Sequence, residues 1–274
     1  MSVHLAETFE SNGQRLYYET YGSGAEVIVY LHGLLLDANI NRGIARTLAA
    51  QGYRVVLLDL PGHGGSDKPT HATLHRFDRY ARHVINLLDH IKVDKAVIGG
   101  VSLGANVSLQ VGVIAPERVR ALIVEMPVLE NAAVISAVIF APLLALVGVG
   151  RPLFNITRKL FARVPRRDRG IPDSLLNLMS NDPKTMAAVL HGILVGPIAP
   201  DVLERSAIAA PTLIIAHNYD LIHPQTDARN LARQLPDARL IYARSILELR
   251  LKPDRLMRQI SEFLGQTVPL SHAA

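Results

Sequence analysis

Short apolar runs alternate along the chain with longer segments in which apolar residues recur at helical spacing. Six of the runs are continuous and uncharged, as strands of a parallel sheet covered on both faces usually are. They lie at residues 27–31, 55–58, 96–98, 121–124, 213–216 and 240–242. Residues 5–10 and 15–20 alternate more regularly and flank Asn12-Gly13, which favours an entering hairpin.

The clearest helical segment lies between residues 77 and 91, where the apolar positions fall on one helix face. These positions are Phe77, Tyr80, Val84, Leu87, Leu88 and Ile91. Strands and helices in alternation indicate an α/β fold, with a mostly parallel sheet of eight strands flanked by helices.

The alternation stops between about Pro127 and Arg205, where helical patterns follow one another without a strand. We therefore expect a helical cap at 127–205, inserted in a core formed by 1–126 and 206–274. The cap begins with the uncharged stretch 132–150, which is long enough to cross a membrane. A single crossing would separate the last two strands from their sheet, and Pro142 interrupts the helical hydrogen bonds. The stretch is thus predicted to be a lid, either packed on the core or exposed to apolar substrates or an anionic membrane surface.

Composition narrows the classes of function. The 274 residues, 49% of them hydrophobic, suffice for a large core, and the absence of cysteine excludes disulfides, thiolate metal sites and a cysteine nucleophile. The start MSVHLAETFE lacks the basic and apolar regions of a signal peptide, so a cytoplasmic protein is expected, with membrane association as an alternative. The sequence contains no metal-ligand cluster and no nucleotide-binding loop, so no cofactor and no metal site are expected.

The net charge of +5 comes from one segment. Residues 151–169 carry seven basic side chains and one acid, and the remainder of the chain is close to neutral. No nucleic-acid-binding motif accompanies the segment, so nucleic acid is not expected as a partner. Peripheral contact with an anionic membrane is the alternative for this segment. The sequence does not indicate an oligomeric state.

A Gly-x-Ser-x-Gly motif, Gly100-Val101-Ser102-Leu103-Gly104, directly follows the apolar run at 96–98 and precedes a helical pattern. Such a turn exposes its serine at the carboxyl edge of a sheet, and the small flanking residues let the backbone turn without a clash. Ser102 is therefore a candidate nucleophile, with a residual turn serine as the alternative.

Three further motifs stand in order around this turn. They are Leu31-His32-Gly33-Leu34, then Asp59-Leu60-Pro61-Gly62-His63-Gly64-Gly65-Ser66, and then the stretch from Pro211 through His217 and Asp220 to Pro224. With these four motifs the chain resembles the α/β-hydrolase fold family over nearly its full length. The resemblance implies that Ser102 is the nucleophile and that the backbone N–H groups of Leu34 and Leu103 form an oxyanion hole. It also implies that Asp220 orients the base, although Asp220 could instead cap the next helix.

The resemblance places the base in the loop after the last strand, about seven residues before a helix-opening proline. Counting back from Pro253 gives Ile246, and no histidine occurs from 224 to 271. The catalytic histidine of the family is therefore expected to be missing. Without a base, a serine hydroxyl is a poor nucleophile, and loss of the histidine alone costs roughly a millionfold in a subtilisin.

Several residues are candidate substitutes, and none is preferred. His217 and His223 lie in the loop of the acid rather than in that of the base, Glu248 is the acid in the base loop, and His191 lies in the cap. His63 is expected to be a hydrogen-bonding loop residue, and Glu125 a solvated carboxylate at a strand end.

Three hypotheses on function follow. The first is a serine hydrolase-like enzyme that acts through Ser102 on a small apolar ester or acyl substrate, weakly because Ile246 replaces the base. The second is an inactive hydrolase-fold protein that binds a hydrophobic ligand. The third is a non-hydrolytic reaction in the same pocket.

Overall fold

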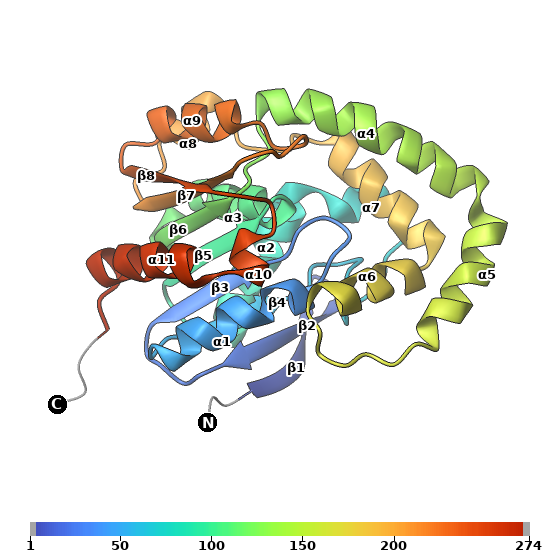
Figure 1. Ribbon diagram of the computed structural model, residues 1–274, viewed down its shortest axis with the longest axis horizontal. Helices are drawn as coiled ribbons and strands as arrows, with labels where there is room; N and C mark the ends of the chain where they lie inside the picture. Colours follow the sequence, from blue (N-terminus) through green and yellow to red (C-terminus); the bar gives the residue numbers. More distant parts are fainter. Residues whose placement is uncertain (1–3, 271–274) are drawn as a thin grey trace.

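One mostly parallel sheet of eight strands forms the centre of the molecule (Figure 1). The computed structural model describes residues 4–270, so His272 lies outside the described residues. The strand order is β1-β2-β4-β3-β5-β6-β7-β8. The strands are β1 (His4–Ser11), β2 (Gln14–Tyr21), β3 (Val27–Leu31), β4 (Arg54–Leu58), β5 (Ala96–Val101), β6 (Val119–Glu125), β7 (Thr212–His217) and β8 (Ala238–Ala243).

The first two strands form the predicted hairpin, with Ser11 opposite Gln14 and a turn at Asn12-Gly13. Both turn residues have positive φ, 52° and 75°, which Asn and Gly adopt most easily and which matches the twist of a hairpin. From β4 to β8 the neighbouring strands are parallel. The predicted sheet and fold class are confirmed.

Helices cover both faces of the sheet because the apolar runs expose side chains on both sides. One core packs α2 (Phe77–His90), α3 (Leu103–Ile114) and α9 (Gln225–Gln234) on the sheet, and a second core packs α1 (Arg42–Ala50) and α11 (Asp254–Thr267) on the other face. The predicted apolar face of α2 is buried from Phe77 to Leu88. The short elements are α10 (Glu248–Leu251) and the 3-10 helices η1 (Ala38–Asn41), η2 (Ala72–His75) and η3 (Pro116–Arg118).

Between β6 and β7 all the regular elements of the described chain are helices. We call residues 127–205 the cap. It contains α4 (Glu130–Val149), α5 (Arg151–Ala162), α6 (Ile171–Ser180) and α7 (Pro183–Val195), and α8 (Val202–Ser206) closes it. In Figure 1, α4 and α5 arch away from the sheet and α6 and α7 return beneath them. The helix α4 continues through Pro142 and is, by length and composition alone, able to span a membrane. Since β6 and β7 pair as neighbours, both ends of the cap return to one sheet.

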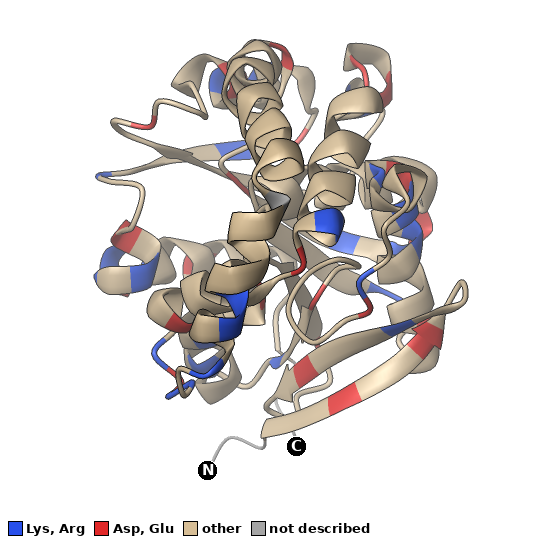
Figure 2. Ribbon diagram, turned by 90° about the vertical axis from the view of Figure 1, so that its right-hand side faces the viewer, with Lys and Arg blue, Asp and Glu red and all other residues tan. Residues whose placement is uncertain are grey.

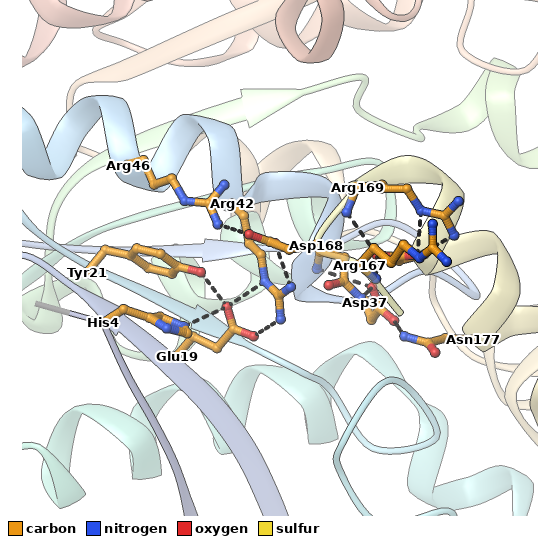
Figure 3. A network of polar contacts seen from close by, with 12 residues as sticks. His4, Glu19, Tyr21, Asp37, Arg42, Arg46, Arg167, Asp168, Arg169 and Asn177 are labelled. Carbon is orange, nitrogen blue, oxygen red and sulfur yellow. Dashed lines mark hydrogen bonds and ion pairs between the residues drawn. The ribbon is translucent and has the colours of Figure 1, made fainter. Parts of the chain in front are cut away.

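Polar contacts attach the cap to the core at its far side (Figure 3). Asp168 pairs with Arg42, 2.8 Å away, and with Arg46, and Arg42 also pairs with the buried Glu19 at 2.5 Å. The Asn177 side chain donates to Asp37 Oδ2 over 2.6 Å. These bonds hold the loop before α6, and α6 itself, against η1 and α1.

At its start the cap is attached by Asp227 of α9. The Asp227 carboxylate accepts hydrogen bonds from the backbone N–H groups of Leu129 at 3.0 Å, Asn131 at 3.3 Å and Ala132 at 2.8 Å. The first N–H groups of a helix have no partner within the helix, so this buried carboxylate caps α4 from the core. The buried Arg205 adds a 2.5 Å ion pair to Glu130.

Candidate active site

The turn between β5 and α3 places Ser102 at the carboxyl end of the sheet. Ser102 has φ 54° and ψ −109°, a conformation that costs a non-glycine residue about 1–3 kcal/mol and recurs at functional sites. A Cβ on Gly104 would lie 2.6 Å from the Leu31 carbonyl oxygen, and one on Gly100 would lie 2.6 Å from the Gly104 carbonyl carbon. The two glycines of the motif are therefore required by backbone contacts.

An imidazole stands against this serine. Ser102 Oγ lies 2.9 Å from His223 Nε2, and His223 Nδ1 lies 2.8 Å from Asp220 Oδ2. The structure thus gives Ser102 an imidazole partner, that of His223, which was one of the candidate substitutes and not a preferred one. Ile246 does occupy the position at which the resemblance placed the base, but the imidazole reaches Ser102 from the loop after β7 instead of the loop after β8.

The loop after β7 supplies both the His223 imidazole and the Asp220 carboxylate. Tyr219 has a φ of 61°, which turns the chain sharply after the strand. Asp220 Oδ1 then accepts hydrogen bonds from the backbone N–H groups of Ile222 at 2.9 Å and His223 at 3.0 Å. This Asx-type turn leaves Oδ2 free for His223 Nδ1 and directs Nε2 toward Ser102.

The charge state of Asp220 suits an orienting acid. Burial by itself raises the pKa of this carboxyl, but the hydrogen bond and charge of His223 and the two backbone donors outweigh burial and lower it. Asp220 is therefore a carboxylate near neutral pH, and its Oδ2 selects the tautomer in which His223 Nδ1 carries the proton and Nε2 accepts one from Ser102.

The other candidate bases are bonded to other groups or lie outside the lining of the cavity that holds Ser102. His217 is buried with Nδ1 2.9 Å from the Ser245 carbonyl and Nε2 3.0 Å from Glu125 Oε1. Glu248 accepts hydrogen bonds from the Arg255 guanidinium, both at 2.8 Å. His191 is exposed on α7, and His63 Nδ1 hydrogen-bonds the Pro61 carbonyl at 3.0 Å.

Glu125 differs from its expected state, because it is fully buried and not solvated. Arg250 Nη1 pairs with it, and Tyr30 Oη donates to Oε2 over 3.1 Å. Burial favours the neutral carboxyl, but the charge of Arg250 and the contact with His217 prevail and lower the pKa of Glu125 to about 2. The cluster lies directly behind Ser102, whose backbone N–H donates to the Glu125 carbonyl at 2.8 Å.

The expected oxyanion donors are the backbone N–H groups of Leu34 and Leu103. Leu103 opens α3, so its N–H has no partner within the helix. The Leu34 loop is held by His32, whose Nδ1 donates to the Gly33 carbonyl over 2.8 Å and whose Nε2 accepts from the Leu60 N–H over 3.0 Å. Burial lowers the pKa of His32 to about 4 and keeps it in this neutral form. Leu34 and Leu103 line the same cavity as Ser102, as an oxyanion hole requires.

The cavity has a volume of about 720 Å³ and lies between the sheet edge and the cap. Its wall is mainly apolar and includes Ala133, Ala137 and Phe140 of α4 and Ile193 and Leu194 of α7. The polar lining side chains are Ser102, Ser136, Asp220, His223 and Arg250. The site thus combines a serine hydroxyl, an imidazole and a carboxylate with a mostly apolar pocket.

Residues 26–244 match the family described as alpha/beta hydrolase fold. The chain belongs to this family.

Among curated proteins, the chain is 41% identical over 113 residues to 2-hydroxy-6-oxononadienedioate/2-hydroxy-6-oxononatrienedioate hydrolase 1 of Dechloromonas aromatica. The matched stretch covers 40% of this chain and 38% of that protein. It is 38% identical over 136 residues to the corresponding hydrolase 2 of Pseudomonas putida, covering 45% and 47%. The matched stretches thus span less than half the length of these relatives. A solved hydrolase from Pseudomonas aeruginosa PA01 superimposes with a TM-score of 0.78 at 21% identity, over 95% of this chain and 98% of that one.

Proposed function

We propose that this protein is a serine hydrolase whose catalytic residues are Ser102, His223 and Asp220. The observation that carries the proposal is a chain of two hydrogen bonds. Ser102 Oγ lies 2.9 Å from His223 Nε2, and His223 Nδ1 lies 2.8 Å from Asp220 Oδ2. A nucleophile with a base that is itself oriented by a third group is the arrangement that activates serine for acyl transfer.

The proposed reaction proceeds through an acyl-enzyme. His223 Nε2 takes the hydroxyl proton as Ser102 Oγ attacks the carbonyl carbon, and the carbonyl oxygen becomes an oxyanion facing the N–H groups of Leu34 and Leu103. The imidazolium, stabilised by Asp220, then gives the proton to the leaving oxygen as the C–O bond breaks. A water attacks the acyl-serine ester, its proton passes to His223 and on to Ser102 Oγ, and the carboxylic acid leaves.

The cavity supports an ester or acyl substrate with an apolar acyl group. Its walls from α4 and α7 offer alkyl and aromatic surface, which gains free energy when it covers a hydrocarbon chain. The curated relatives are hydrolases of dicarboxylates by their names. In the described part of this chain the cation that lines the cavity, Arg250, is already bound to Glu125, which argues for an uncharged acyl group here.

The binding-only and non-hydrolytic hypotheses drew their support from the expected absence of a base. With His223 beside Ser102, no observation in the described residues favours either one over hydrolysis. They remain as outcomes of the experiment below.

The experiment is turnover of p-nitrophenyl esters of increasing acyl length, together with labelling by a fluorophosphonate probe. We expect the wild type to be labelled and to prefer a medium acyl chain, and Ser102→Ala to lose both labelling and turnover. Tight fatty-acid binding by an unlabelled, inactive wild type would instead mean that the site binds without turnover.

A further inference from the structure

An exposed apolar stripe runs along the outside of the cap. On α4 and α5, large exposed apolar side chains recur three or four residues apart, except for a gap of eight between Val138 and Leu146. The members of this outer stripe are Val134, Val138, Leu146, Val149, Leu153, Ile156 and Leu160, each at least 60% exposed. Of the 18 most apolar consecutive residues of α4, only 11% are buried. Such contiguous exposed apolar surface marks an interaction site.

Basic side chains border the α5 end of the outer stripe. Lys159 and Arg163 are exposed and lie one helical turn after Ile156 and Leu160. Arg166 and Arg169 of the same basic segment are instead used inside the cap, where they bind Asn177 and Asp173. Figure 2 faces this side and shows cap helices without charge for most of their length and Lys and Arg toward the lower end.

The charges favour an anionic occupant over a second copy of the chain. No acidic residue occurs from 131 to 167, and the next acid, Asp168, is already paired with Arg42 and Arg46. The same surface on another copy therefore offers no carboxylate to Lys159 or Arg163. A bilayer that contains anionic lipids supplies both the apolar layer for the outer stripe and the negative charge for its border.

We propose that the cap docks on an anionic lipid surface through the outer stripe, with Lys159 and Arg163 at the headgroups. The inner side of the same helix α4 lines the cavity with Ala133, Ala137 and Phe140. The surface and the cavity are thus separated by one helix, about 10 Å across. The proposal concerns where the protein resides and does not require Ser102 to be catalytic.

The test is co-sedimentation of the full chain with vesicles of phosphatidylcholine alone and of phosphatidylcholine mixed with phosphatidylglycerol. We expect at least roughly tenfold tighter binding to the anionic vesicles, weakening as salt is added. Lys159→Glu/Arg163→Glu should lose this preference, and Leu153→Ser/Ile156→Ser/Leu160→Ser should lose binding to either vesicle.

Arg79→Glu/Arg82→Glu is the matched control, because it makes the same change of charge at exposed positions of α2, outside the cap. It should bind anionic vesicles as the wild type does, and circular dichroism should show all variants folded. Equal binding to both vesicles, or wild-type binding by the Lys159/Arg163 variant, overturns the proposal. A dimer that forms without vesicles and is lost in the triple serine variant would show that a second copy covers the stripe.

Discussion

At the scale of single residues, the site depends on which of two neighbouring histidines meets the serine. His217 ends β7 and turns to the buried Glu125, whereas His223 follows the Asp220 turn and meets Ser102. The proposed base therefore comes from the loop after β7, which also carries Asp220, and not from the loop after β8. This arrangement leaves Ile246 free to line the cavity as an apolar side chain.

We expect His223→Ala to lower kcat for p-nitrophenyl esters by about 10⁴–10⁶, with KM little changed, because Ser102 loses its proton acceptor. The double variant Ser102→Ala/His223→Ala should be no slower than Ser102→Ala, since the two residues act as one unit. His191→Ala, which removes an exposed histidine of the cap, is the control and should retain wild-type kcat. A His223→Ala enzyme with near-normal kcat would reject the proposed base.

Ile246→His tests the usual base position directly. Because Ser102 Oγ already has an imidazole at 2.9 Å, a second imidazole adds no proton transfer, and we expect less than an order of magnitude of increase in kcat/KM. The measurement is steady-state esterase kinetics beside the conservative variant Ile246→Val. A large gain would mean that His223 is not the working base.

At the scale of elements, the cap is attached to the core by polar residues at its start and on its far side. Asp227 belongs to α9 but caps α4, and Asp168 belongs to the cap but binds α1. Both carboxylates satisfy donors on another element, so each one couples two elements that are distant in sequence. The α4 helix has few buried residues of its own, which makes these contacts important to its position.

Asp227→Ala should lower the free energy of unfolding by about 2 kcal/mol or more, because three backbone N–H groups at the start of α4 lose their acceptor in a buried place. Limited proteolysis should then cut the cap before the core. Asp182→Ala is the matched control, since Asp182 caps α7 through one bond, to the Lys184 N–H at 2.9 Å, and should cost about 1 kcal/mol. Equal losses in urea unfolding would contradict the special role of Asp227.

The strands and helices could be predicted from the sequence, because the buried runs are uncharged and the apolar face of α2 follows helical spacing. The position of Ser102 on the turn before α3 was predictable because only glycines tolerate the close backbone contacts around it. The partner of Ser102 was not, because His217 and His223 both stand near Asp220 in sequence. Only the turn at Tyr219 and the Asp220 bonds to two backbone N–H groups decide which imidazole reaches Ser102. The Asp-x-x-His spacing was the available signal.

At the scale of the whole molecule, the buried cluster around Glu125 joins distant parts of the core. Glu125 ends β6, Arg250 comes from α10, and Tyr30 comes from β3. Arg250 Nη2 also donates to Asn41 Oδ1 over 3.0 Å. A buried carboxylate and guanidinium are costly to desolvate, and removal of one partner leaves the other uncompensated.

This cluster predicts how stability depends on pH. The pKa of Glu125 falls from 4.5 to about 2 on folding, because Arg250 and His217 outweigh burial, so the unfolded chain binds its proton first as the pH falls. The stabilisation is therefore complete above about pH 4.5 and is lost toward pH 2, by roughly 3 kcal/mol. Glu125→Gln should cost about 3–5 kcal/mol at neutral pH and flatten the fall in Tm between pH 5 and pH 2, measured by calorimetry. Glu262→Gln, at an exposed partner of Arg239, should keep the wild-type slope; a Glu125→Gln profile parallel to it would show that the buried carboxylate does not govern acid stability.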